Sequence, residues 1–219
     1  MPLGWRTPAS AYDPKELVPL EPYSASDSKL IEALKGCKLL ASSTEIDPGE
    51  KFFQSETGEI TIDGPNGRLV LDTPRTAGGY APAGQGVEGK KGGVRITFQG
   101  ANATLWVSSL DDKPIRTSGR LLVTHLTDLQ NSGIRYGETA RQTLLDWGHL
   151  PYLVRAGLAD VAIELEAPKN YKVWALSIGG KRLALVPSRV EGKSLVFMAD
   201  VGAGPANGAR MLYEVALTN

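Results

Sequence analysis

The chain is poor in cysteine and has no excess of positive or negative charge. Cys37 is the single cysteine in 219 residues, so neither a disulfide within the chain nor a cysteine-based zinc site is possible. Because a free cysteine is usually buried, we expect Cys37 to pack inside a strand over residues 37–43. The 24 basic and 24 acidic side chains cancel, which argues against nucleic acid or an anionic membrane as a partner.

Long apolar runs are also missing. No window approaches the roughly 20 apolar residues that a membrane-spanning helix needs. Residues 1–20 hold four prolines and no continuous apolar segment, so no signal peptide is visible. An extracellular or periplasmic location is the working hypothesis, with an export signal that has been removed or is carried by a longer parent chain.

The motifs of nucleophilic and metal catalysis are absent from the sequence. There is no Gly-x-Ser-x-Gly elbow, and the two histidines, His125 and His149, lie apart without a His-x-His or His-Glu-x-x-His pattern. We therefore assign no catalytic residue.

Acidic side chains are the remaining candidates for metal binding. Asp111 with Asp112, and the trio Glu56, Glu59 and Asp63, carry the oxygen ligands that calcium prefers, although no EF-hand spacing exists. We expect solvated turn carboxylates and no cofactor, with a structural calcium ion as the alternative.

Short alternating segments separated by turn residues dominate the sequence from Cys37 onward. This pattern predicts an all-β fold, an antiparallel, jelly-roll-like β-sandwich, and its spacing leaves no room for parallel crossovers. The expected strands cover residues 37–43, 50–55, 59–63, 68–73, 77–83, 93–99, 103–110, 119–128, 152–155, 158–166, 171–178, 194–199 and 210–217.

One hairpin is expected to organise the sheet. Residues 59–63 and 68–73 alternate polar and apolar side chains around Asn66-Gly67, a pair that tolerates the positive φ of hairpin turns. At its end, Arg75 is expected to pair with Asp72 or Asp63, and ligand contact by Arg75 is the alternative.

The amino-terminal residues have a different composition. Residues 1–28 are rich in proline, serine and aromatic side chains, which predicts an extended arm lying on a core. A short helix over residues 29–35 should end at Gly36. We therefore expect an arm with one short helix over residues 1–36 and a single β-sandwich domain over residues 37–219.

Aromatic side chains are the main candidates for ligand contact, because they stack on sugar rings. Trp106 and Trp174 lie inside apolar strands and are expected to pack in the core. Trp5 and Tyr80 are expected to be exposed, and Trp147 follows them as a third candidate.

Several motifs follow one another along the chain. They are SETGEI at 55–60, VLDTPRT at 70–76, LWVSSLDDKPI at 105–115, RLLVT at 120–124, LLDWGHLPYLV at 144–154 and RMLYEV at 210–215. In the same order, they resemble the β-rich portion that flanks the catalytic barrel of large bacterial glycoside hydrolases.

The resemblance covers residues 37–219 by pattern, although Ala77 and the glycine-rich segment 78–92 depart from the family. That portion is non-catalytic in the family, so the resemblance implies that this chain supports a catalytic domain or binds polysaccharide. Residues 1–36 match nothing in the family.

Three functions remain open at this point. The first is a non-catalytic carbohydrate-associated module, with a polysaccharide or oligosaccharide, or a glycoside hydrolase catalytic domain, as partner. The second is a free-standing polysaccharide-active enzyme that uses carboxylates such as Glu56, Glu59 or Asp63 in a groove. The third is a structural domain without a ligand.

Overall fold

A computed structural model describes residues 32–33, 35–38, 52–55, 57–204 and 208–218. The chain divides into two compact units, Met1–Glu50 and Lys51–Asn219. The predicted arm of residues 1–28 lies outside the described residues. No helix in the described ranges has the length and apolar character needed to cross a membrane.

The described residues of the first unit belong to the predicted short helix and the turn after it. Glu32, Ala33, Lys35 and Gly36 are helical. Cys37 follows in a turn and is exposed, so the prediction that it is buried in a strand was wrong. Its amide donates to the Ala33 carbonyl at 2.9 Å, because the last carbonyls of a helix need donors from the residues that follow.

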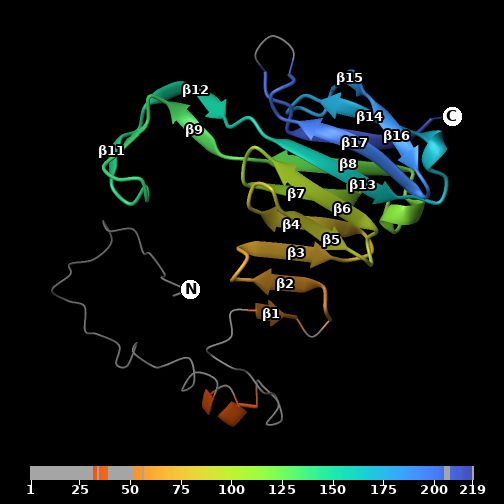
Figure 1. Ribbon diagram of the computed structural model, residues 1–219, viewed down its shortest axis with the longest axis horizontal. Helices are drawn as coiled ribbons and strands as arrows, with labels where there is room; N and C mark the ends of the chain where they lie inside the picture. The colour runs from red at the N-terminus through yellow and green to blue at the C-terminus, as the bar shows by residue number, and fades with distance from the viewer. Residues whose placement is uncertain (1–31, 34, 39–51, 56, 205–207, 219) are drawn as a thin grey trace. The chain divides into compact units, whose positions relative to one another are not determined.

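The second unit is an all-β sandwich of antiparallel strands, as predicted (Figure 1). The larger sheet has nine strands, in the order β1 (Phe52–Gln54), β2 (Ile60–Asp63), β3 (Arg68–Asp72), β4 (Thr76–Ala81), β7 (Ala103–Ser109), β8 (Arg120–Leu126), β18 (Leu212–Leu217), β14 (Tyr171–Leu176) and β15 (Arg182–Val186). The smaller sheet has five, in the order β16 (Ser188–Glu191), β17 (Ser194–Asp200), β13 (Leu158–Glu164), β6 (Val94–Gln99) and β5 (Gly86–Gly89).

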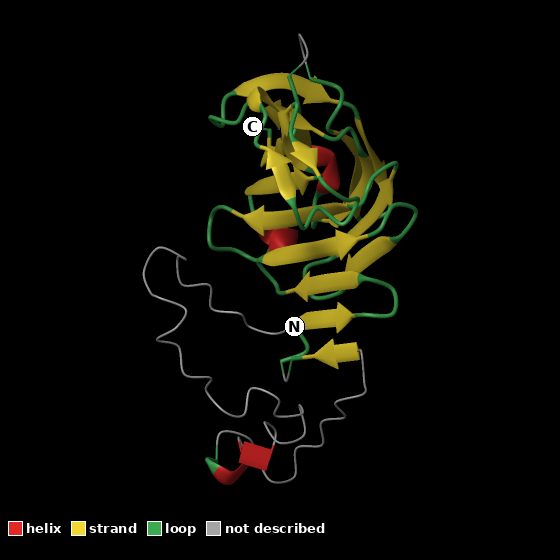
Figure 2. Cartoon of the chain, turned by 90° about the vertical axis from the view of Figure 1, so that its left-hand side faces the viewer, coloured by secondary structure: helices red, strands yellow, loops and turns green. Residues whose placement is uncertain are grey.

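Helical structure in the described part of this unit is limited to two short 3-10 turns, Ile115–Thr117 and Pro168–Asn170, drawn red between the yellow strands in Figure 2. The strand β5 was missed because its sequence begins and ends in glycine. A side chain at Gly86 would meet the Ile96 carbonyl oxygen at 2.4 Å, so glycine is needed where these backbones approach.

The predicted hairpin is present as β2 and β3, which pair in register from Ile60 with Leu71 to Asp63 with Arg68. Gly67 has the expected positive φ, +61°. The hairpin lies toward one edge of the nine-stranded sheet, however, and the central strands are β7 and β8. The expectation that the hairpin organises the sheet was therefore wrong.

The core lies between the two sheets. Alternate residues point inward, so that Leu105 and Val107 on β7 are fully buried together with Val161 and Ile163 on β13. The same alternation turns Trp106 to the opposite face, where it is only half-buried.

Trp174 follows the same rule. It stands between the buried Val173 and Ala175 on β14 and is half-buried on the other face. The prediction that Trp106 and Trp174 pack in the core was therefore wrong, because an apolar strand interior still has two faces.

A long hairpin extends from the sandwich (Figure 1). It consists of β9 (Leu129–Ser132) paired with β12 (His149–Val154), and of β10 (Arg135–Tyr136) paired with β11 (Leu144–Asp146). We call residues 129–154 the hairpin arm.

Candidate functional site

The first feature of the candidate site is the face of the nine-stranded sheet that points away from the five-stranded sheet, here called the outer face. Residues directly opposite one another in antiparallel strands share a face. Phe53 pairs with Ile62, Ile62 with Leu69, and Leu69 with Tyr80, so this row of apolar side chains crosses four strands and ends at an aromatic ring.

Tyr80 and Trp106 are neighbours on the outer face. Tyr80 pairs with Thr104, two residues before Trp106, and such diagonal neighbours lie about 7–8 Å apart. Trp174 lies on the same face. Ser108, two residues after Trp106, pairs with Leu122, Leu122 pairs with Glu214, and Glu214 pairs with Trp174. Its ring is partly covered, because the Arg182 guanidinium carbon lies 5.2 Å from the ring centroid.

A buried carboxylate holds Arg182 over this ring. Glu214 is 3% exposed and accepts hydrogen bonds from Arg182 Nε at 2.6 Å and Arg120 Nε at 2.5 Å. The bond from Arg182 is the main reason that the pKa of Glu214 lies below its ordinary value, and burial opposes it. The ion pairs of Glu214 with Arg182 and Arg120 therefore hold the Arg182 guanidinium against the Trp174 ring.

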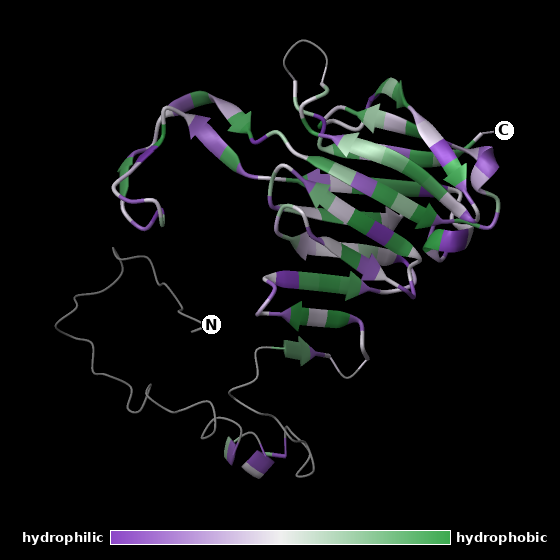
Figure 3. Cartoon of the chain, in the orientation of Figure 1, coloured by the Kyte–Doolittle hydropathy of each residue, from purple (hydrophilic) through white to green (hydrophobic). Residues whose placement is uncertain are grey.

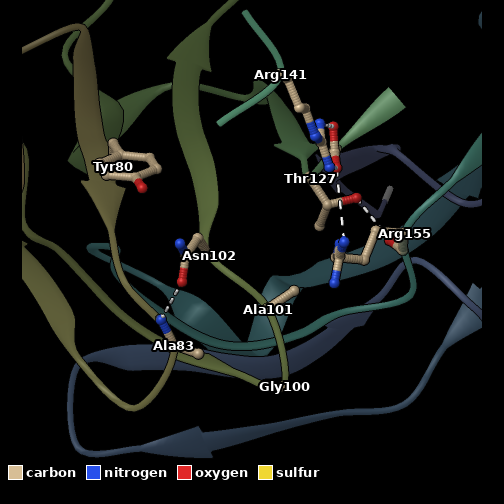
Figure 4. Close-up of a pocket in the computed structure, with 9 residues that line it drawn as sticks. Tyr80, Ala83, Gly100, Ala101, Asn102, Thr127, Arg141 and Arg155 are labelled. Carbon is tan, nitrogen blue, oxygen red and sulfur yellow. Dashed lines mark hydrogen bonds and ion pairs between the residues drawn. The ribbon is translucent and has the colours of Figure 1, made fainter. Parts of the chain in front are cut away.

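The second feature is a cavity of about 490 Å³ at the end of the outer face where Tyr80 lies (Figure 4). Its lining comes from five separate stretches of the chain. The lining residues are Tyr80, Ala83, Gly100, Ala101, Asn102, Thr127, Asp128, Arg141 and Arg155.

Three charged side chains dominate one wall of the cavity. Asp128 accepts two parallel hydrogen bonds from Arg141, at 3.1 and 2.7 Å. Arg155 Nη2 lies 3.7 Å from Asp128 Oδ2, too far for a hydrogen bond. The bonds from Arg141 hold the pKa of Asp128 below its ordinary value against the effect of burial, so this carboxylate is ionised at neutral pH.

Local backbone structure positions these groups. Arg141 has a left-handed φ of +57° in a loop whose amides, from Gln142 and Thr143, donate to the Glu138 carboxylate. The Arg155 amide donates to the Asp128 carbonyl at 2.8 Å. Both arginine side chains therefore extend from backbone that hydrogen bonds hold in place.

The opposite wall is aromatic and amide-bearing. Figure 4 shows Tyr80 across the cavity from the two arginines, with the Asn102 amide on the same side as Tyr80. Asn102 Oδ1 accepts from the Ala83 amide at 3.0 Å, which directs the side-chain nitrogen to the other side. That nitrogen donates no hydrogen bond within the described part of the chain, so it can serve a ligand.

The structure separates the residues that the sequence proposed. Tyr80 lines the cavity, whereas Trp147 is 73% exposed in the hairpin arm.

Arg75 pairs with Asp112 at 3.2 Å and not with Asp72 or Asp63, so that pairing was predicted wrongly. Asp72 instead accepts hydrogen bonds from the Lys91 and Gly92 amides. Asp63 forms its ion pair with Arg68. Trp5 lies outside the described residues.

Sequence reasoning missed the polar side of the cavity. Asn102, Asp128, Arg141 and Arg155 carry no motif, and only the fold brings them together.

The histidines and most acidic candidates lie elsewhere. His125 is fully buried in the core, and His149 Nδ1 lies 2.8 Å from the Leu150 carbonyl on the exposed arm. Asp111 accepts from the Gly119 amide and from Ser109. Across the described ranges, no three ligand-type side chains are grouped closely enough to hold a metal ion, and Glu56 lies outside those ranges.

Comparisons with protein-family models, with curated proteins and with solved structures found no match for this chain. The outer face and the cavity therefore carry the functional inference.

Proposed function

We propose that this chain is a non-catalytic, carbohydrate-associated β-sandwich module that binds a polysaccharide or oligosaccharide in the cavity beside Tyr80 and along the adjoining outer face. The observation that carries the proposal is the exposed Tyr80 ring, which lies beside the Asn102 amide and faces two guanidinium groups across a cavity of about 490 Å³. Sugar rings stack their C–H faces on aromatic rings, and planar polar groups bind their hydroxyls.

The lining of the cavity holds too few carboxylates for hydrolysis and therefore favours binding. Glycoside hydrolysis uses two carboxylates about 5–10 Å apart, one of which is protonated as an acid. Asp128 is the single carboxylate among the lining residues, and Arg141 keeps it ionised. The free-standing enzyme is therefore the weaker hypothesis for this site.

Affinity electrophoresis against a panel of polysaccharides tests the proposal. We expect retarded migration on at least one glycan. Replacing Tyr80 by alanine should abolish the retardation, and Tyr80→Phe should keep most of it, because phenylalanine retains the ring. Trp147→Ala is the matched aromatic control, since Trp147 lies in the hairpin arm and not in the cavity.

Unchanged migration on every glycan would refute binding. Release of reducing sugar from the same panel would favour the enzyme instead.

A second role, support of a glycoside hydrolase catalytic domain, is favoured by a different observation. The hairpin arm exposes large apolar side chains, and β2 and β3 are coloured mainly as hydrophobic in Figure 3. The exposed apolar residues of the arm are Leu129, Leu145, Trp147, Leu150, Tyr152 and Leu153. Several large exposed apolar side chains within one short segment are typical of protein interfaces.

Size-exclusion chromatography with a catalytic domain from the same parent chain or a neighbouring gene tests this role. We expect a complex that Leu145→Ser with Trp147→Ser weakens and Tyr80→Ala leaves intact. Separate elution of the unmodified proteins at micromolar concentration would exclude it.

A further inference from the structure

The charge of the cavity bears on the class of sugar that it would bind. The lining residues include two guanidinium groups and one carboxylate. Arg141 and Asp128 satisfy each other through two hydrogen bonds. Arg155 meets the same carboxylate only as a longer ion pair, at 3.7 Å, so the lining keeps a net charge of +1, although the chain as a whole has zero net charge.

Arg155 is available to a ligand. Its side chain is 58% exposed and meets Asp128 only at 3.7 Å, and it donates no hydrogen bond to the residues that the structure describes. Its backbone is held on both sides, because the Arg155 amide donates to Asp128 and the Thr127 hydroxyl donates to the Arg155 carbonyl at 2.6 Å. The guanidinium therefore projects from a fixed point into the cavity.

We propose that the cavity binds a carboxylate-bearing saccharide, such as a uronic acid unit, with the sugar ring on Tyr80 and the carboxylate on Arg155. This inference rests on the proposed function and names its ligand class. A planar guanidinium presents parallel donors that match the two oxygens of a carboxylate. The Asn102 amide nitrogen lies on the same side as Tyr80 (Figure 4) and donates to a ring hydroxyl.

Asp128 adds selectivity against a more strongly charged ligand. It lies beside Arg155 and is ionised, so it repels the additional negative charge of a densely sulfated chain. A single carboxylate per sugar unit balances the net charge of +1 in the lining. The cavity should therefore prefer polyuronates over sulfated glycans.

The experiment compares polygalacturonate with the same polymer after methyl esterification, which removes the charge and keeps the backbone. Alginate, a neutral xylan and dextran sulfate complete the panel. We expect retardation by one or both polyuronates and little by the esterified polymer. Arg155→Gln should weaken binding roughly ten- to hundredfold, the range expected for a hydrogen bond to a charged group.

Matched variants locate the effect. Arg75→Gln removes an exposed guanidinium outside the cavity and should bind as the unmodified chain does. Arg155→Lys should recover part of the affinity, because it restores charge without the planar fork. Circular dichroism and thermal unfolding of each variant establish that it is folded.

The outcomes separate the inference from the proposed function. Equal retardation by the acidic and esterified polymers, or retardation by the neutral xylan alone, would overturn the inference and leave glycan binding in place. Stronger binding of dextran sulfate, or an Arg155→Gln variant that binds polyuronate normally, would overturn it as well. No retardation by any polymer would overturn both.

Discussion

His125 makes a sharp test of the core packing. It lies on β8, is fully buried, and neither ring nitrogen has a hydrogen-bond partner in the described part of the chain. The ring centroid lies 6.3 Å from that of Phe98. Burial lowers the pKa of His125 from 6.5 to about 4, and the Ala199 backbone and the Asp200 charge oppose this shift only in part.

The sign of the effect follows from where the proton binds. Between pH 6.5 and pH 4 the unfolded chain takes up a proton at His125 and the folded chain does not, so the free energy of unfolding falls as the pH falls. The full slope is about 1.4 kcal/mol per pH unit. Between pH 7.5 and pH 5 this histidine should cost the protein about 2 kcal/mol of stability.

The carboxylates act in a different pH range. Asp63, Asp111, Asp128 and Glu214 have lowered pKa values, from ordinary values of 3.8 for aspartate and 4.5 for glutamate. Their contribution is present above these ordinary values and is lost as the pH falls through the folded values. Between pH 7.5 and pH 5, the change in the free energy of unfolding is therefore assigned to His125.

Urea unfolding at several pH values between 5 and 7.5 measures the effect. We expect the free energy of unfolding to fall by about 2 kcal/mol in the unmodified chain and to stay nearly level in His125→Leu, whose side chain is apolar and of similar size. His149 is present in both proteins, so its contribution cancels. Identical pH dependence of the two proteins would show that His125 is not buried in a neutral form.

Two further predictions concern the sheet itself. Glu214→Gln should lower the free energy of unfolding by about 1–3 kcal/mol, because Arg182 loses its charged acceptor, and tryptophan fluorescence should report the released Trp174 ring. Gly79→Ala should destabilise by about 2 kcal/mol or more, because the new Cβ would lie 2.0 Å from the Leu69 carbonyl oxygen. Gly179→Ala, whose Cβ would approach nothing closer than 3.9 Å, is the matched control, and equal melting temperatures of the two alanine variants would contradict this packing.

Local patterns of the sequence were enough to predict the all-β class, the hairpin at Asn66-Gly67 and the approximate position of most strands. Side-chain alternation and turn geometry act over a few residues, so they can be read from neighbours in the chain. They do not say which face of a strand is covered. Trp106 and Trp174 were therefore assigned to the core, although the second sheet covers only the opposite face.

The candidate site depends on the order of strands in space. Tyr80 could be proposed from its glycine-rich surroundings. Asn102, Asp128, Arg141 and Arg155 become its neighbours only because β4 pairs with β7, β7 pairs with β8, and the hairpin arm returns to the sandwich. Such contacts join residues up to 75 positions apart, from Tyr80 to Arg155, and no periodicity encodes them. Composition and alternation determined what kind of sheet this chain forms, whereas the tertiary structure alone decided which polar groups share one cavity and which guanidinium there has no hydrogen-bonded partner among the described residues.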